Sequence, residues 1–132
     1  MLAPFSISAA DSSSATEPKA KAERFFVSLV NNKIEPAFTE LMGGSFMATS
    51  QPGAINVLQN QTETAFKIYG VPFEFELVRE EQVSPSVTRL VYFLKTDKQP
   101  TNWELYFYKA KSTWVLSQIA FADQYNFIGS KK

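Results

Sequence analysis

The sequence contains no histidine and no cysteine among its 132 residues. Without them there is no Ser-His-Asp triad, no cysteine nucleophile, no zinc site of nitrogen and sulfur ligands, and no imidazole to exchange protons near neutral pH. Any chemistry must therefore use carboxylates, tyrosine, lysine, serine or threonine. The lack of cysteine suits both a reducing cytoplasm and an exported protein that needs no disulfide.

Net charge and long apolar runs are missing as well. Thirteen basic and 13 acidic residues cancel, so no overall field attracts the phosphate backbone of nucleic acids or an anionic membrane surface. No apolar run approaches the roughly 20 residues of a membrane span. The aspartates Asp11, Asp97 and Asp123 are scattered along the chain, so no calcium-binding loop is formed. We therefore expect no nucleic acid partner, no membrane span, no metal and no cofactor.

Aromatic residues, in contrast, are abundant: 12 phenylalanines, five tyrosines and two tryptophans. Most of them lie between Phe73 and Phe127, and aromatic side chains favour the pleated, half-buried surface of a sheet. The chain length suits a single domain. We expect that domain at residues 17–127, after a disordered tail or residual signal segment at 1–16 and before a carboxyl-terminal tail at 128–132.

The first ten residues, MLAPFSISAA, suggest where in or outside the cell the protein is located. Ser8 and Ala10 have the spacing that leader peptidases use, and a polar run follows them. A basic start is missing, and Pro4 interrupts a short apolar stretch. We hypothesise a shortened precursor whose mature chain begins near Asp11 in the periplasm or outside the cell. The alternative is the disordered tail of a cytoplasmic protein, and an intact Met1 in protein purified from the native host would support it.

Helical spacing of apolar residues predicts three helices in the first half of the chain. They are expected at residues 16–32, from Pro36 to the glycine pair at 43–44, and from just after Ser50 to residue 69. Thr62 is a polar residue at the centre of the apolar face of the third helix. We expect its hydroxyl to bond to the main-chain carbonyl one turn earlier, and a ligand contact is the alternative.

From residue 73 the apolar period changes to about two, which is the period of a strand. Strands are expected at residues 73–83, 87–95, 102–109 and 114–125. The short connections between them imply antiparallel neighbours in sequence order. Helices grouped before strands predict an α+β fold, with the helices packed on one face of a curved four-stranded antiparallel sheet.

Three segments carry a resemblance to a known family. They are AERFFVSLVNN, IEPAFTELM and above all WELYFYKAKSTWVLSQIAFAD. Together with the order of elements, they resemble the nuclear transport factor 2-like superfamily, a cystatin-like α+β cone, over about residues 20–125. Many members have a strand pair between the second and third helices, and residues 43–50 are too short for one, so this chain would be a reduced form. The resemblance implies a conical pocket between helices and sheet, which different members use for catalysis, for ligand binding or not at all.

The ketosteroid isomerases of that superfamily use an aspartate base with a tyrosine and a protonated acid. The resemblance would place their tyrosine on the first helix, where this chain has Phe25 and Phe26, so their chemistry is not transferred. The acid and phenol pairs that remain are Asp123 with Tyr69 or with Tyr106. A surface carboxylate and ordinary core aromatics are the simpler interpretation of these residues.

Three functions stay open. We prefer a non-catalytic exported domain that binds a small apolar molecule or a partner protein in or around an aromatic-lined cone. The others are an isomerase or dehydratase of the ketosteroid isomerase or polyketide cyclase type with a buried carboxylate, and a structural module whose outer sheet face forms a homodimer and whose cone is filled by its own side chains. No catalytic residue is assigned. The candidates for lining the pocket are Phe26, Thr62, Phe66, Tyr69, Trp103, Tyr106 and Asp123.

Overall fold

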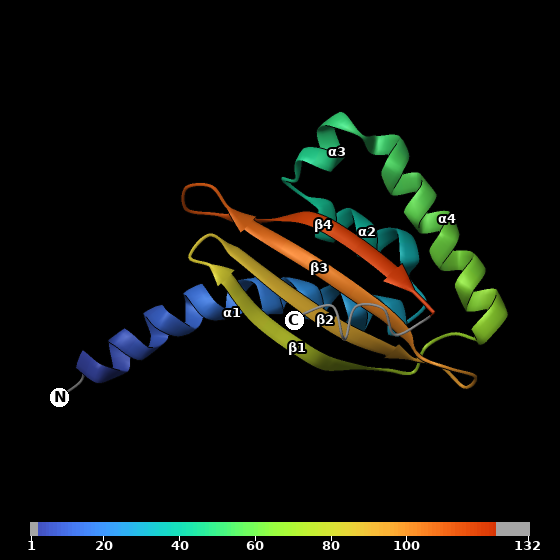
Figure 1. Cartoon of the computed structure of the whole chain (residues 1–132), viewed down its shortest axis with the longest axis horizontal. Coiled ribbons are helices and arrows are strands. Elements are labelled where there is room, and N and C mark those ends of the chain that lie inside the picture. Colours follow the sequence, from blue (N-terminus) through green and yellow to red (C-terminus); the bar gives the residue numbers. More distant parts are fainter. Residues whose placement is uncertain (1–2, 124–132) are drawn as a thin grey trace.

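Four helices precede four strands along the chain (Figure 1). The structure, a computed structural model, describes residues 3–123, and the side chains of residues 17–123. The helices are α1 Ala3–Val30, α2 Ile34–Met42, α3 Phe46–Ser50 and α4 Pro52–Tyr69. The strands are β1 Glu74–Ser84, β2 Val87–Lys95, β3 Thr101–Lys109 and β4 Trp114–Ala122.

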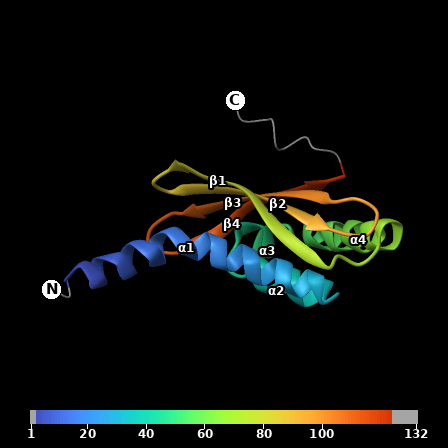
Figure 2. The same cartoon turned by 90° about the horizontal axis from the view of Figure 1, so that it is seen from below.

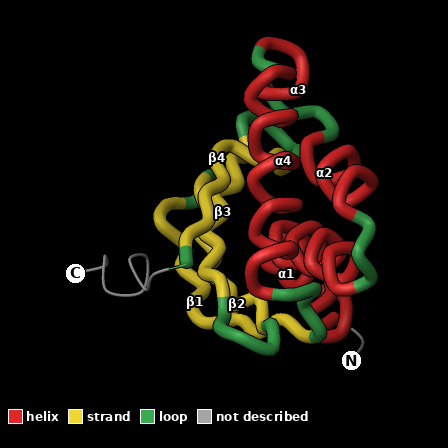
Figure 3. Tube along the Cα trace, turned by 90° about the vertical axis from the view of Figure 1, so that its right-hand side faces the viewer, coloured by secondary structure: helices red, strands yellow, loops and turns green. Residues whose placement is uncertain are grey.

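The four strands form one antiparallel sheet in the order β1-β2-β3-β4. All four helices lie on the same side of this sheet, as Figures 2 and 3 show from two directions. The expected α+β class, with helices on one face of a four-stranded sheet, is confirmed. The last residues of the domain and the tail predicted at 128–132 lie outside the described residues, as does the expected end of the last strand at 125.

Two expectations about the helices are wrong. The first helix begins at Ala3 rather than near residue 16, and Pro18 lies inside it instead of in its first turn. A fourth helix, α3, was not predicted because its five residues are too few to show a helical period. Ser45 caps α3, since its Oγ accepts a hydrogen bond from the Ala48 amide at 3.1 Å. Whether residues 1–16 hold the remnant of a leader stays a prediction.

Aromatic side chains fill the space between the helices and the sheet. Phe25 and Phe26 of α1 meet the indole of Trp103 edge to face, at centroid distances of 5.6 Å and 5.9 Å. On its other side Trp103 stacks on Phe121 at 4.3 Å. Phe38 of α2 packs against Phe25 at 5.0 Å. The chain's own side chains therefore occupy the interior of the expected cone.

Thr62 of α4 is a polar residue that is fully buried. Its hydroxyl donates to the Leu58 carbonyl at 2.7 Å. The predicted bond is confirmed, and it provides the partner that a buried hydroxyl requires.

Tyr92 makes the stability of the fold depend on pH in the alkaline range. Its ring is buried, and its hydroxyl donates to Glu23 Oε2 at 3.1 Å. Burial, and next the negative charge of Glu23, raise the pKa of Tyr92 above its ordinary value of 10.0. A phenol whose pKa is raised by folding stabilises the native state fully below the unfolded pKa, and this contribution is lost as the pH rises from there toward the folded pKa.

We therefore expect the free energy of unfolding to fall further between pH 9 and 11 in the native chain than in Tyr92→Phe. One such tyrosine accounts for about 1.4 kcal/mol of extra loss. Urea unfolding of both proteins at several pH values measures the difference. Parallel pH profiles would contradict the assignment.

Candidate functional site

A cleft of about 470 Å³ opens between α4 and the ends of β3 and β4. Its volume falls in the range of pockets that hold small molecules. The helical wall consists of residues three to four apart on α4, which therefore share one face. The lining residues are Asn60, Gln61, Thr64, Ala65, Ile68 and Tyr69 from α4, with Thr101, Phe121, Ala122 and Asp123 from the sheet.

One end of this cleft is closed by polar contacts between α4 and the sheet. The Tyr69 hydroxyl donates to Asp123 Oδ2, and Gln99 Nε2 donates to the main-chain carbonyl of Asp123 at 2.6 Å. Lys98 Nζ donates to the Ile68 carbonyl at 3.3 Å. Figure 1 shows α4 and β4 converging at this end. The contacts fix the position of the last turn of α4 relative to the end of β4.

The hydrogen bond to Asp123, more than desolvation or charge, raises the pKa of Tyr69. The phenol is therefore held in its protonated form as a donor, and the Asp123 carboxylate remains able to accept further hydrogen bonds. Of the two acid and phenol pairs named from the sequence, the structure brings together Asp123 and Tyr69. Tyr106 lies on the other face of the sheet, next to Arg89 and Glu104.

Beyond this polar end, the wall of the cleft is mixed: Asn60, Gln61, Thr64 and Thr101 are polar, and Ala65, Ile68, Phe121 and Ala122 are apolar. Phe121 contributes a ring that already stacks on Trp103. Ile68 is about half exposed at the opposite wall, and Ala65 leaves space between them. The arrangement suits a ligand with an apolar body and one group that donates a hydrogen bond or carries a positive charge.

Most other pocket candidates lie elsewhere. Phe26 and Trp103 are buried in the core, because the large rings of the cone pack against one another. Phe66 borders a separate cleft of about 490 Å³ beside the turn between α1 and α2. Thr62 is buried and bonded to its own helix. Of the seven candidates, Tyr69 and Asp123 line the cleft between α4 and β4.

Carboxylates are not buried in this cleft. Asp123, the acid that lines it, is exposed. Glu23 is bonded to Tyr92 at α1, and Glu104 lies on the outer face of the sheet. Among the residues whose side chains are described, no group of three acidic residues could hold a metal ion. The cleft therefore offers hydrogen bonding and apolar contact.

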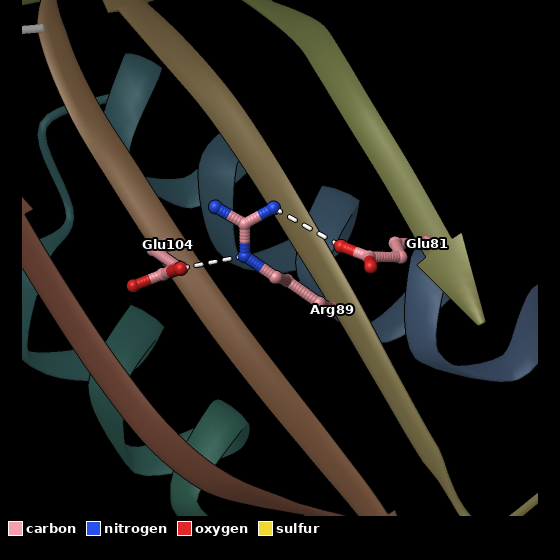
Figure 4. Close-up of polar contacts among 3 residues, drawn as sticks. All are labelled: Glu81, Arg89 and Glu104. Carbon is pink, nitrogen blue, oxygen red and sulfur yellow. Dashed lines mark hydrogen bonds and ion pairs between the residues drawn. The ribbon is translucent and has the colours of Figure 1, made fainter. Parts of the chain in front are cut away.

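The outer face of the sheet carries a charge cluster that the sequence analysis did not foresee (Figure 4). Arg89 of β2 is 4% exposed, although no helix covers this face. Its Nε donates to Glu104 Oε2 of β3 at 2.6 Å, and its Nη1 donates to Glu81 Oε1 of β1 at 3.2 Å. The alternation of β2 was the available signal, since Arg89 directly precedes Leu90, which faces the helices.

The charges of this cluster stabilise each other. Burial by itself lowers the pKa of Arg89, but the hydrogen bond and attraction of Glu104, with the help of Glu81, raise it overall. Burial and the negative charge of Glu104 raise the pKa of the neighbouring Tyr106, which keeps this phenol protonated. The three charged groups link three adjacent strands.

Comparisons of this chain with protein-family models, with curated proteins and with solved structures find no match. Between residues 3 and 123, none of the helices combines the length and apolar character needed to cross a bilayer. Function must therefore be argued from the geometry of the site.

Proposed function

We propose that this chain is a non-catalytic binding domain whose ligand, a small apolar molecule or an apolar segment of a partner protein, occupies the cleft between α4 and β4. The observation that carries the proposal is an open cleft in which an apolar patch of Ala65, Ile68, Phe121 and Ala122 lies beside the polar contact of Tyr69 with Asp123. The interior of the cone is filled by Phe25, Phe26 and Trp103, so the ligand binds beside the cone.

Binding is favoured over isomerisation by the position of the carboxylates. A carboxylate that serves as an enolising base works best when burial raises its pKa toward the operating pH. Asp123 is exposed and already accepts a hydrogen bond from Tyr69. The isomerase or dehydratase alternative would need another carboxylate at the cleft, and the described residues lining it include none.

The family, the location and the assembly are part of the same proposal. Membership of the nuclear transport factor 2-like superfamily is supported by helices that cover one face of an antiparallel sheet. Export is supported by the leader-like residues 1–10. A homodimer through the outer sheet face is supported by Tyr106, whose ring lies on that face beside Arg89. Light scattering that gives the mass of one chain would contradict the dimer.

Filling the cleft tests its role in binding. Ala65→Trp should weaken binding of the neutral apolar dye N-phenyl-1-naphthylamine by at least about tenfold, because the indole takes the ligand's place beside Phe121. Val57→Trp is the matched control, since Val57 is exposed on α4 outside the cleft. Dye fluorescence gives the affinities, and circular dichroism checks the fold. Failure of the native chain to bind the dye, or equal affinities in both variants, would contradict the proposal.

A further inference from the structure

In the part of the sheet that the structure describes, β4 is an edge strand without charged residues, and one bulge at Ser117 interrupts its pairing with β3. In the described sheet it pairs with β3 and has no strand on its other side. Alternate N–H and C=O groups of an antiparallel edge strand point away from the sheet and can pair with another chain. Natural edges are usually blocked by charges, prolines or bulges. The sequence of β4, WVLSQIAFA, contains neither a charge nor a proline.

The strand at the opposite edge of the sheet, β1, has the features that usually prevent pairing with a further strand. β1, EFELVREEQVS, carries four glutamates and one arginine. Its pairing with β2 shifts register twice, whereas that of β4 with β3 shifts once, next to Tyr106. The two edges therefore differ in their ability to accept a further strand. The charges of β1 oppose an added strand, and β4 presents none.

A hollow lies beside each end of β4. The cleft described above reaches its last residues and Asp123. A second hollow, of about 200 Å³, is lined by Val115, Leu116 and Ser117 at the start of β4, and by Phe46 and Met47 of α3. Figure 1 shows α3 and α4 beyond this edge of the sheet. The two hollows lie at the two ends of the strand, and residues 118–120 between them line neither hollow.

The wall of the second hollow includes an exposed aromatic side chain, Phe46. Its ring is 73% exposed, more than any other large apolar side chain with a described position. Tyr108 of β3 lines the same hollow and is also exposed. Exposed aromatic rings beside an open strand edge are the kind of pocket that receives alternate side chains of a bound peptide.

We propose that the edge of β4 accepts a fifth strand, an extended and uncharged peptide segment of a partner protein. The main chain of the segment pairs with β4, and its alternate side chains enter the two hollows. A second copy of this chain fits less well, because it would bring its own α3 and α4 to the same narrow space. The inference rests on the proposed binding at the cleft between α4 and β4, and it names the ligand as a peptide strand.

The antiparallel pattern of the sheet sets the direction of the added segment, and that direction predicts where the segment carries a charge. Every pair of neighbouring strands in this sheet is antiparallel, and an added antiparallel strand places its amino-terminal end beside the end of β4. There the cleft presents Asp123, and no other charged side chain lines either hollow among the described residues. The segment therefore has uncharged side chains in its middle and a positive charge, an α-amino group or a lysine, at its amino-terminal end.

The test uses the synthetic peptide Lys-Thr-Val-Thr-Val-Thr-Val-amide with a free amino terminus. Titration calorimetry should detect binding to the full chain, and nuclear magnetic resonance should show the largest amide shifts in β4. A strand pairs through one edge, so methylation of alternate peptide nitrogens on that edge should weaken binding at least about tenfold, and methylation on the other edge should not. Shifts centred on β1, or equal affinity for both methylated peptides, would overturn the proposal.

Two variants complete the test. Phe46→Ser should weaken peptide binding several-fold, while Phe73→Ser, a matched change of an exposed phenylalanine before β1, should not. Asp123→Asn should weaken binding of the lysine peptide by a larger factor than binding of an acetylated peptide without lysine. If the neutral dye binds in the cleft and the peptide does not bind, the strand proposal fails and the cleft's role in binding stands. If neither binds, both proposals fail.

Discussion

Replacing Trp103 by alanine is expected to lower the free energy of unfolding by about 3–5 kcal/mol. The side chain is 1% exposed and contacts aromatic rings from both layers, Phe25 from α1 and Phe121 from β4. Truncation leaves a cavity that these rings cannot close, and it removes the bond from Trp103 Nε1 to Thr101 Oγ1 at 2.8 Å. Urea unfolding followed by circular dichroism measures the loss.

Tyr108→Ala provides the control for this change. Tyr108 is on the same strand and is 44% exposed, so the loss should stay within about 1 kcal/mol. If Trp103→Ala does not fold, Trp103→Phe retains part of the contacts and should still lose more stability than Tyr108→Ala. Equal losses at the two positions would show that the core is not organised around Trp103.

Replacing Arg89 by methionine is expected to lower the free energy of unfolding by about 3 kcal/mol. The change keeps an apolar stem in the sheet but leaves the partly buried Glu104 carboxylate without the arginine that compensates it. Removing both charges, as Arg89→Met with Glu104→Met, should restore most of the stability, because the acid that remains, Glu81, is 40% exposed and is solvated by water. The double-mutant cycle then gives the coupling between the two side chains.

A second arginine–glutamate pair offers a matched control. Arg24 Nε lies 3.0 Å from Glu40 Oε2, but the Arg24 side chain is 54% exposed. Arg24→Met should therefore lower the free energy of unfolding by less than about 1 kcal/mol. Urea unfolding of all the variants at one salt concentration makes the comparison. Similar losses for Arg24→Met and Arg89→Met would contradict the argument that burial makes the Arg89 pair important.

The fold could be predicted where a local pattern decides it. The alternation from residue 73 onward placed β2 at its observed bounds and the starts of the other strands within one residue. The bond from Thr62 to Leu58 was predictable because both groups lie on one helix. The start of α1 was missed because Pro18 suggested a first turn, although it lies inside a longer helix.

The site could be predicted less well, because it depends on contacts between distant parts of the chain. Tyr69 and Asp123 are 54 positions apart. The sequence named both residues, but Tyr106 was an equal partner for Asp123 until the face of each strand was known. Phe26 and Trp103 were expected to line an open cone, and their packing with neighbouring rings fills it. Whether a cone is open depends on side-chain volumes that no spacing pattern reports.

The contact between Tyr69 and Asp123 also determines how the cleft can change its width. α4 has 18 residues, which makes it about 27 Å long, and it is joined to β4 at its last residue. Thr62 and Phe66 of the same helix are buried in the core. The helix is therefore held along its buried face as well as at its last turn. Pro52, Gly53 and Ala54 of its first turn are exposed, so any widening of the cleft is expected at that end.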